Sequence, residues 1–387
     1  MQAQEVTLPD NHRSRLATAF WSALQFSQGL TDFIVHEGKP VYVKSAKGLV
    51  PLASLGLPGA DFAVGAADIK NFLATYLDNI RATETANGYW DTHIEPVLRR
   101  MEPINRSLAI PPLQKGGRPA QLRASVMKHG EGKLGMVLRL VLPPPALESI
   151  HLPAPVMERL QTNPRGLLII TGPTASGKTA TALSMLEYLN THASGHIVTI
   201  EDPVELPLES RGCVITQRQV GIDVPSFGAG LIDAMRHAPD AILAGEVRDR
   251  DAAEAAVMGG ESGSLFLITT HGRSVVGTLR KILALCGDNV STAMRTVMAG
   301  SLIGVIRQEL VPHADGKGYS MVHETLTATD AISNHISRGD WTALENICSK
   351  DVPSDGFFPM RVRINQLVHE RRISPDAAAL VVRSRAR

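Results

Sequence analysis

Residues 166–179 read GLLIITGPTASGKT, and this stretch decides the fold of the chain. The apolar run 166–171 predicts a buried strand, and the glycine-containing segment 172–179 follows it directly. Beyond the segment, one helical face is marked by Ala182, Leu183, Leu186 and Leu189. A strand, a loop of the form G-x-x-x-x-G-K-T and a helix that opens near Lys178 together predict a P-loop in an α/β domain.

The residue types of this loop suit phosphate chemistry. Glycines let backbone N–H groups converge on phosphate oxygens, and the positive end of the following helix favours an anion. We expect Lys178 to reach the β and γ phosphates of ATP and Thr179 to bind Mg²⁺. The predicted nucleotide-binding residues are Gly172, Thr174, Ala175, Ser176, Gly177, Lys178 and Thr179. A glycine-rich turn that binds no nucleotide is the alternative.

The composition describes a globular chain. It has 387 residues, of which 44% are hydrophobic, enough for two domains. The 39 Lys and Arg residues nearly balance 38 Asp and Glu residues, which argues against a dedicated nucleic-acid binder. Three scattered cysteines form neither a metal spacing nor a disulfide framework, and no apolar run of membrane-spanning length occurs. We expect a cytoplasmic protein whose membrane contact comes through partners.

Two seams divide the chain. A proline-rich connector, residues 146–158, separates an N-terminal domain, 1–145, from the P-loop domain, 146–350. A second polar seam precedes a short helical tail, 351–387. In the N-terminal domain we expect paired strands at 33–35 and 41–43, a helix with apolar positions from 69 to 80, and a strand at 134–142. This pattern indicates a small α+β domain.

Acidic residues follow two further predicted strands. The segment 197–205 runs from a β-branched strand into Glu201 and Glu205, and the segment 240–249 runs from an apolar strand into Glu246. A P-loop enzyme needs carboxylates at strand ends beside its loop, to hold Mg²⁺ and orient water. Gly245 stands where a Walker B aspartate is usual, so Glu246 is the carboxylate available to the metal or the water. Solvated loops after strands are the alternative for both segments.

A third strand, 265–270, ends at His271. An imidazole beside a phosphate site can donate a hydrogen bond to the γ-phosphate at neutral pH without a fixed charge. A lone histidine is more often structural, so position alone leaves both interpretations open.

Four ordered segments carry a resemblance to a known family: GPTASGKT (172–179), VTIEDPVE (198–205), DAILAGEVRD (240–249) and ESGSLFLITTH (261–271). They resemble the Walker A, Asp box, Walker B and His box of the type II/IV secretion ATPase superfamily. Within it the chain is most similar to the PilT-type pilus-retraction ATPases and the DotB-type ATPases of type IVB secretion and conjugation. The segment 29–35 is similar to the opening of the family's PAS-like N-terminal domain, and 305–310 to its C-terminal part.

The resemblance implies a RecA-like P-loop core, a PAS-like N-terminal domain, and a hexameric motor ATPase that serves a type IV pilus or a type IV secretion or conjugation machine. Its partners would be copies of itself and inner-membrane platform or secretion-channel proteins. Glu201 and Glu205 would belong to the Asp box, Glu246 would be the Walker B glutamate, and His271 a His-box histidine. Arg123 and Arg139 of the N-terminal domain would reach the γ-phosphate.

Three positions depart from the family pattern. Ser264 stands where the family has a first His-box histidine, Gly272 and Arg273 follow His271 in place of small hydroxyl residues, and Ile232 replaces an arginine before the Walker B strand. These changes bear on the coupling of nucleotide state to domain motion more than on nucleotide binding.

Other functions stay open on the sequence. A RecA-like nucleic-acid translocase would need a basic channel, a small-molecule kinase would need an acceptor pocket with a base, and a nucleotide-gated assembly factor would hydrolyse negligibly. Hydrolysis stimulated by DNA, phosphate transfer to a metabolite, or tight ATP binding without turnover would distinguish them.

Overall fold

The computed structural model describes residues 14–26, 30, 32–45, 48–57, 60–76, 90–100, 104–110, 120–141, 143–287, 292–315, 318–354 and 356–385. The chain forms two compact units. Unit 1 comprises residues 1–143 with 315–319, and unit 2 comprises residues 144–314 with 320–387.

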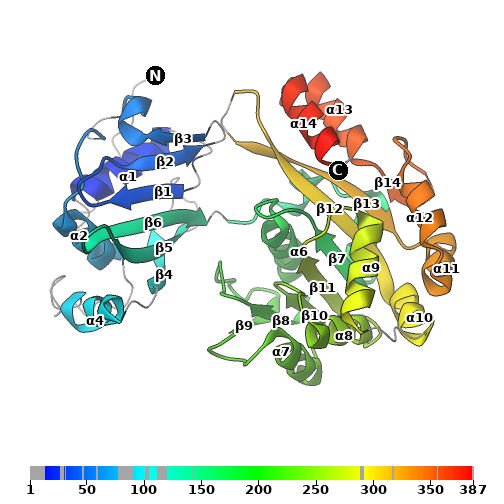
Figure 1. The fold of residues 1–387 in the computed structure, drawn as a ribbon. Helices are drawn as coiled ribbons and strands as arrows, with labels where there is room; N and C mark the ends of the chain where they lie inside the picture. The colour runs from blue at the N-terminus through cyan, green and yellow to red at the C-terminus, as the bar shows by residue number, and fades with distance from the viewer. Residues whose placement is uncertain are drawn as a thin grey trace. The chain divides into compact units, whose positions relative to one another are not determined.

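Unit 1 is built on a six-stranded antiparallel sheet of order β3-β2-β1-β6-β5-β4 (Figure 1). Its strands are β1 (Asp32–His36), β2 (Tyr42–Ser45), β3 (Gly48–Pro51), β4 (Ile104–Ile110), β5 (Ala120–His129) and β6 (Lys133–Val141). Its helices are α1 (Arg15–Phe26), the 3-10 helix η2 (Leu52–Leu55), α2 (Ala66–Tyr76), the π-helical turn η3 (Trp90–Ile94) and α4 (Glu95–Arg99).

The core of unit 1 lies between α1, α2 and the sheet. The Phe20 ring of α1 lies 4.7 Å from the Phe33 ring of β1 and 5.6 Å from the Phe72 ring of α2, measured between centroids. The expected strands near residues 33 and 41 are observed as the antiparallel pair β1 and β2, and the strand expected at 134–142 is β6. The expected helix is α2, although positions 77 and 80 of its apolar stripe lie outside the described residues, as do 29 and 31 of the family-like segment.

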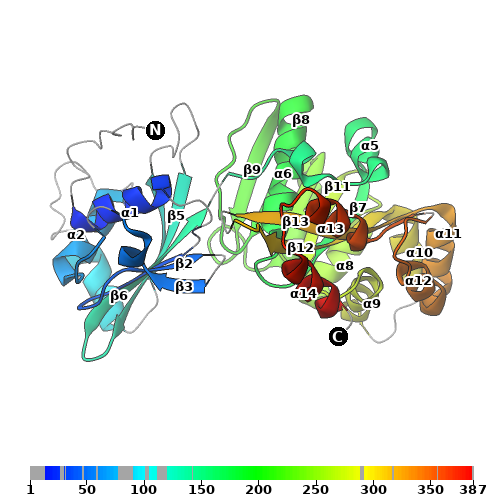
Figure 2. The same cartoon turned by 90° about the horizontal axis from the view of Figure 1, so that it is seen from above.

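Unit 2 is built on an eight-stranded sheet of order β14-β13-β12-β7-β11-β10-β8-β9 (Figure 1 and Figure 2). The strands are β7 (Gly166–Thr171), β8 (Gly195–Glu201), β9 (Cys213–Gln219), β10 (Ala241–Ala244), β11 (Leu265–Thr270), β12 (Leu302–Pro312), β13 (Tyr319–Thr327) and β14 (Phe357–Phe358). The six strands from β12 to β9 in this order are parallel. Unit 2 is therefore an α/β unit with a mixed, mostly parallel sheet.

Helices cover both faces of this sheet. They are η4 (Leu147–Ile150), α5 (Ala154–Thr162), α6 (Lys178–His192), α7 (Phe227–Ala234), η5 (Met235–His237), α8 (Arg250–Gly259), α9 (Val275–Leu285), α10 (Thr292–Ser301), α11 (Asp330–Arg338), α12 (Trp341–Cys348), α13 (Met360–His369) and α14 (Pro375–Arg385). All six residues of β7 are buried, as expected for a central parallel strand that is covered on both faces.

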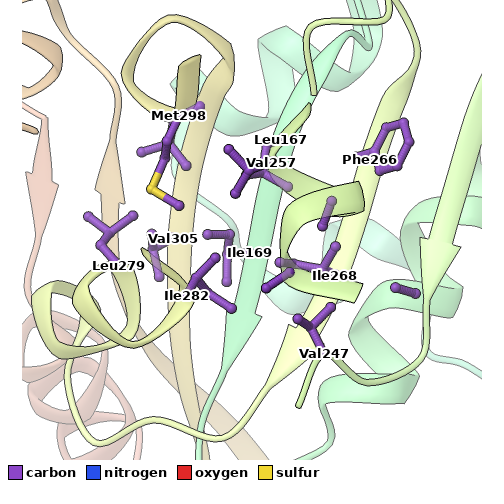
Figure 3. Close-up of a cluster of buried hydrophobic side chains, with 14 of the residues drawn as sticks. Leu167, Ile169, Val247, Val257, Phe266, Ile268, Leu279, Ile282, Met298 and Val305 are labelled. Carbon is purple, nitrogen blue, oxygen red and sulfur yellow. The ribbon is translucent and has the colours of Figure 1, made fainter. Parts of the chain in front are cut away.

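The large hydrophobic cluster of unit 2 joins one face of the sheet to α7–α12. Figure 3 shows its central part, where Leu167 and Ile169 of β7 meet Val257 of α8 and Ile282 of α9. Because side chains alternate along a strand, Leu168 and Ile170 face the opposite side, where α6 lies against β7. The P-loop strand is thus held firmly from both sides.

The proline-rich segment is more regular than a plain connector. Within 146–158 the structure has the 3-10 helix η4 and the start of α5. Pro153 is the N-cap of α5 and a further proline lies in its first turn, where the missing N–H costs no hydrogen bond.

The tail forms two helices, α13 and α14, that pack on unit 2. Their buried residues Ile364 and Leu367 share a small apolar cluster with Val311 of β12 and Val322 of β13. None of the helices in the described parts of the chain has the length and apolar composition that a membrane crossing requires.

Candidate functional site: the phosphate-binding edge of unit 2

The carboxyl ends of four parallel strands meet at one edge of the unit 2 sheet. In the pairing register, Ile169 of β7 lies beside Ile268 of β11, Ile268 beside Ala244 of β10, and Ala244 beside Ile200 of β8. The residues that follow these positions therefore emerge together. Ligands of open α/β sheets bind at this kind of edge.

The loop between β7 and α6 has the backbone of a phosphate cradle. Gly172 and Gly177 have φ values of 152° and 84°, which favour glycine, and Ala175 adopts a φ of 61°. A Cβ on Gly172 would lie 2.3 Å from the Gln308 carbonyl oxygen, so no side chain fits there. Gly177 is the N-cap of α6 and offers the helix no side-chain cap, which leaves the first-turn N–H groups to other acceptors.

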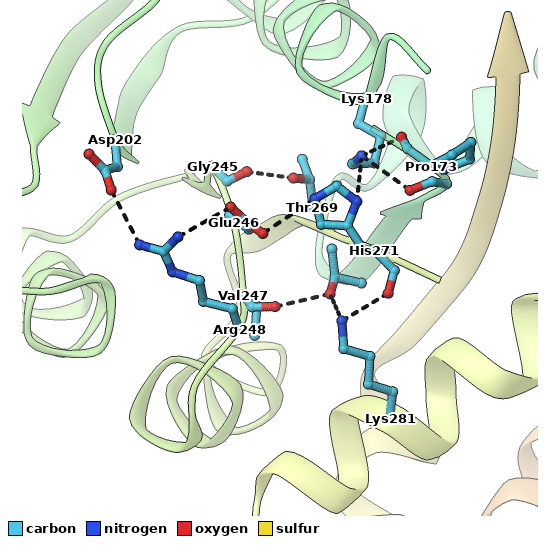
Figure 4. A network of polar contacts seen from close by, with 12 residues as sticks. Pro173, Lys178, Asp202, Gly245, Glu246, Val247, Arg248, Thr269, His271 and Lys281 are labelled. Atoms are coloured by element: carbon cyan, nitrogen blue, oxygen red, sulfur yellow. Dashed lines mark hydrogen bonds and ion pairs between the residues drawn. The ribbon is translucent and has the colours of Figure 1, made fainter. Parts of the chain in front are cut away.

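Lys178 lies at the centre of the site (Figure 4). Its Nζ donates to the carbonyl oxygens of Gly172 at 3.2 Å and Pro173 at 3.0 Å, and lies 3.4 Å from Nδ1 of His271. Burial and, to a smaller extent, the charge of Lys281 lower the pKa of Lys178, while the Glu246 carboxylate opposes the shift. The ammonium is thus partly desolvated, which strengthens its attraction for an anion.

His271 connects Lys178 with Glu246. It follows β11, which lies between β7 and β10 in the sheet. If Nδ1 accepts from Lys178, the ring proton resides on Nε2, and that atom lies 3.5 Å from Oε1 of Glu246. Lys281 of α9 fixes the backbone here, since its Nζ donates to Thr270 Oγ1 at 3.1 Å and to the His271 carbonyl at 2.8 Å.

Glu246 is a half-buried carboxylate next to two basic groups. Besides His271, it has the Arg248 guanidinium 3.9 Å from its Oε2, and the same guanidinium lies 3.4 Å from Oδ2 of Asp202 (Figure 4). The preceding residue is confined, because a Cβ on Gly245 would lie 3.1 Å from the Ile200 carbonyl oxygen of β8. A larger residue at Gly245 would push β8 and β10 apart.

Glu201 differs from Glu246 in that its side chain is 3% exposed. Its Oε1 accepts from Thr199 Oγ1 at 2.7 Å and Gln217 Nε2 at 2.9 Å, and the carboxylate also accepts from the Glu205 backbone N–H. Burial raises the pKa of Glu201 in spite of these hydrogen bonds. Glu205 itself is half-buried in the loop after β8.

The raised pKa predicts a pH-dependent cost to stability. Below the ordinary value of 4.5 both folded and unfolded Glu201 are protonated, whereas above the raised folded value both are ionised and the burial penalty is complete. Glu201→Gln should therefore gain stability relative to the natural protein as pH rises from about 4.5 to 8. Thermal midpoints across this range would measure it, with exposed Glu158→Gln as control. A constant difference between variant and natural protein would contradict the prediction.

The residues expected to hold Mg²⁺ are Thr179 and Glu246. Thr179 is the second residue of α6 and half-buried, and Glu246 lies at the same edge of the sheet. A hydroxyl and a carboxylate are hard oxygen ligands, and Mg²⁺ commonly takes only one or two protein ligands beside water and phosphate. The donor set fits the ion. Among the described residues no cluster of three or more His, Cys, Asp or Glu side chains forms a metal cage.

The departures from the family pattern have separate structural settings. Ser264 precedes β11, at the edge of the sheet opposite the P-loop, and its Oγ donates to the Pro239 carbonyl at 2.6 Å. Within one chain it is therefore remote from the phosphate site. A Cβ on Gly272 would lie 2.1 Å from Thr278 Oγ1, so only glycine fits there. Arg273 and Ile232 are exposed, the latter on α7 with 45% of its surface accessible.

Arg123 and Arg139 lie side by side in unit 1. They are direct cross-strand partners on β5 and β6. Arg139 Nε donates to Oδ1 of Asp32 at 2.7 Å, yet its side chain remains 62% exposed.

Three residues of the site were not singled out from the sequence: Arg248, Lys281 and Gln308. Arg248 lies within the quoted Walker B segment and could have been found there as the basic neighbour of Glu246. Lys281 is a cation on a largely apolar helix face, which is a weak signal. Nothing in the sequence connects Gln308 with a loop 132 residues earlier.

Comparison with known proteins agrees with this geometry. A family model described as "Type II/IV secretion system protein" matches residues 146–350. The chain belongs to this family. Its match to a twitching motility protein of Neisseria gonorrhoeae is 31% identical over 259 residues and covers 67% of this chain and 69% of that protein. The type IV pilus ATPase PilU of Pseudomonas aeruginosa is 36% identical over 208 residues, which cover 54% of each chain.

Solved structures of secretion-family ATPases show the same fold. The pilus retraction motor PilT with bound ADP superposes with a TM-score of 0.70 at 26% identity, covering 92% of this chain and 93% of that chain. The ATPase DotB of Legionella pneumophila superposes with a TM-score of 0.75 at 18% identity, covering 99% and 98%. The family member described here therefore shares the two-unit α/β fold of PilT and DotB. It spans only about half the length of the PilU protein.

Proposed function

We propose that this protein is a motor ATPase that hydrolyses ATP to ADP and phosphate with Mg²⁺ in unit 2. The observation that carries the proposal is the chain of contacts from the P-loop through Lys178 and His271 to Glu246 (Figure 4). PilT, which has the same fold, was solved with ADP. The experiment is a measurement of ATP turnover by the purified full chain, with Mg²⁺ present and with Mg²⁺ chelated.

The residues of the site divide the work of an in-line attack by water on the γ-phosphate. The loop N–H groups and Lys178 hold the phosphates and neutralise their charge. Bound Mg²⁺, held by Thr179 and Glu246, supplies further charge stabilisation. Glu246 is half-buried and accessible, so it can orient the attacking water, while His271 can sense the γ-phosphate through its contacts with Lys178 and Glu246.

Glu201 and Glu205 are assigned a supporting role in this proposal. The Glu201 carboxylate already accepts hydrogen bonds from Thr199, Gln217 and the Glu205 backbone, so it fixes the turn after β8. Asp202, at the start of that turn, contacts Arg248, which in turn contacts Glu246. The Asp box thus acts on Glu246 through Arg248.

We infer that unit 2 is a RecA-like core, unit 1 a PAS-like domain, and the working assembly a hexameric ring. The strand order supports the first point, because β11 lies between the P-loop strand β7 and the strand β10 that precedes Glu246. The similarity to PilU, PilT and DotB supports service to a type IV pilus or a type IV secretion or conjugation machine. Copies of the chain and an inner-membrane platform or channel protein would be its partners, at the cytoplasmic face.

In this proposal Arg123 and Arg139 complete the site by reaching the phosphates when the domains of the ring close. Their register on adjacent strands gives a paired donor surface, and arginine binds phosphate in a fixed fork that lysine does not reproduce. Arg123→Lys and Arg139→Lys should each lower turnover at least about tenfold. Steady-state assays would test this, with exposed Arg99→Lys of α4 as control.

Light scattering of the ATP-bound Glu246→Gln protein should show a mass above that of the monomer. A strict monomer at micromolar concentration, together with fully active arginine variants, would defeat the ring motor and leave an isolated P-loop ATPase. Stimulation by DNA would instead favour a nucleic-acid translocase, and ATP binding without turnover in the natural protein a nucleotide-gated assembly factor.

A further inference from the structure

We propose that Gln308 of β12 is a positioning residue of the phosphate-binding loop, which it holds through the peptide between Ser176 and Gly177. The inference rests on the ATPase function proposed above and deepens it. Gln308 is fully buried on the strand that neighbours β7. Its role is to aim loop N–H groups at the phosphates.

The hydrogen bond that carries this inference joins Gln308 Nε2 to the Ser176 carbonyl oxygen at 2.8 Å. A trans peptide is planar, and its C=O and N–H point in opposite directions. Since the Ser176 carbonyl is held towards β12, the N–H of Gly177 points away from β12. Gln308 thereby sets the direction of a backbone donor just before Lys178.

Gln308 also contacts both glycine ends of the loop. A Cβ on Gly172 would lie 2.3 Å from the Gln308 carbonyl oxygen, and one on Gly177 would lie 3.4 Å from Gln308 Nε2 and 3.6 Å from Leu310 Cδ1. Gln308 and Leu310 are two residues apart on a strand, so their side chains share a face. The loop therefore rests on a platform made by β12, and Gln308 provides the polar part of it.

Two buried polar atoms at this contact have no hydrogen-bond partner among the residues that the structure describes: Gln308 Oε1 and Ser176 Oγ. Buried polar atoms without partners are rare and mark places that change on binding. In our proposal the Ser176 hydroxyl and the Gln308 amide oxygen provide the hydrogen-bonding capacity that the loop uses when it adjusts to phosphate.

The neighbours of Gln308 along the strand belong to another contact. Arg307 and Glu309 pair with each other, and Arg307 reaches Sδ of Met360 on α13 at 3.7 Å. Because side chains alternate across a strand, they lie on the face opposite Gln308. Gln308 can therefore be replaced without removing a partner of this ion pair.

The test is the affinity of fluorescent mant-ATP and mant-ADP for Gln308→Met and Gln308→Glu. Methionine keeps the length of the side chain but removes the donor, and glutamate places an acceptor opposite the Ser176 carbonyl. We expect Gln308→Met to weaken both nucleotides about tenfold, the effect of losing one hydrogen bond that orients a donor to a charged group. Gln308→Glu should weaken them further, and the thermal midpoint of both ligand-free variants should stay near that of the natural protein.

Two controls separate the possible outcomes. Exposed Gln366→Met on α13, whose amide donates to Glu370 within the helix, should bind normally. Lys178→Ala should lose turnover; if it does not, the proposed ATPase function fails independently of Gln308. If Lys178→Ala loses turnover while both Gln308 variants bind nucleotide normally, the positioning role is overturned. A lowered ligand-free midpoint with unchanged affinity would overturn it equally, since that result describes packing alone. Should Gln308→Met not fold, Gln308→Glu carries the test.

Discussion

Replacing Lys178 with alanine should abolish measurable ATP hydrolysis and strongly weaken nucleotide binding while leaving the fold intact. The Nζ of Lys178 now donates to the Gly172 and Pro173 carbonyls and lies beside His271, so it is held where the loop converges. Alanine removes the only point charge expected to meet the β and γ phosphates. Turnover should fall by at least about 10²–10³-fold, the effect of removing one strong electrostatic stabiliser of a transition state.

Binding should weaken by about 1.5–3 kcal/mol, the value of a hydrogen bond to a charged group. Folding should tolerate the change, because alanine favours the helix that begins at this position and no carboxylate is printed as an ion-pair partner of Lys178. Steady-state turnover, mant-nucleotide titration and thermal unfolding would be compared with exposed Lys350→Ala. Unchanged turnover in a well-folded variant would refute the P-loop assignment.

The local part of the site could be predicted from the sequence. The order of an apolar run, a glycine loop and a helical stripe predicts β7 and α6, and α6 begins at Lys178. Glu201, Gly245 and His271 are expected at strand ends because β-branched and apolar runs stop there. Parallel strands then bring those ends to one edge. These inferences depend on residues close together in the chain.

The contacts between distant segments could not be predicted in this way. Periodicity does not say that β11 lies between β7 and β10, yet this order is what puts His271 between Lys178 and Glu246. Gln308 reaches the loop because β12 pairs with β7, and strand pairing over such a distance leaves no local pattern. The start of α5 was also missed, since prolines suggest a connector but are tolerated in the first turn of a helix.

Replacing Glu246 with glutamine should give a protein that binds ATP but turns it over far more slowly. The change keeps the shape of the side chain, and a glutamine oxygen can still accept from His271 Nε2, which lies 3.5 Å from the present carboxylate. It removes the negative charge, and with it the ability to bind Mg²⁺ and to orient water as a carboxylate does. We expect turnover to fall about 10²–10³-fold, as for other groups that act mainly in the transition state.

The comparison with other carboxylates makes this prediction decisive. Glu201 is buried and accepts hydrogen bonds from Thr199 and Gln217, so Glu201→Gln should act mainly on stability. Glu205→Gln should retain much more turnover than Glu246→Gln, and exposed Glu158→Gln should retain all of it. Single-turnover assays with mant-ATP would separate binding from chemistry. If Glu246→Gln hydrolysed ATP normally while Glu205→Gln did not, the water would be oriented from the turn after β8, and the contacts of Glu246 with His271 and Arg248 would be structural.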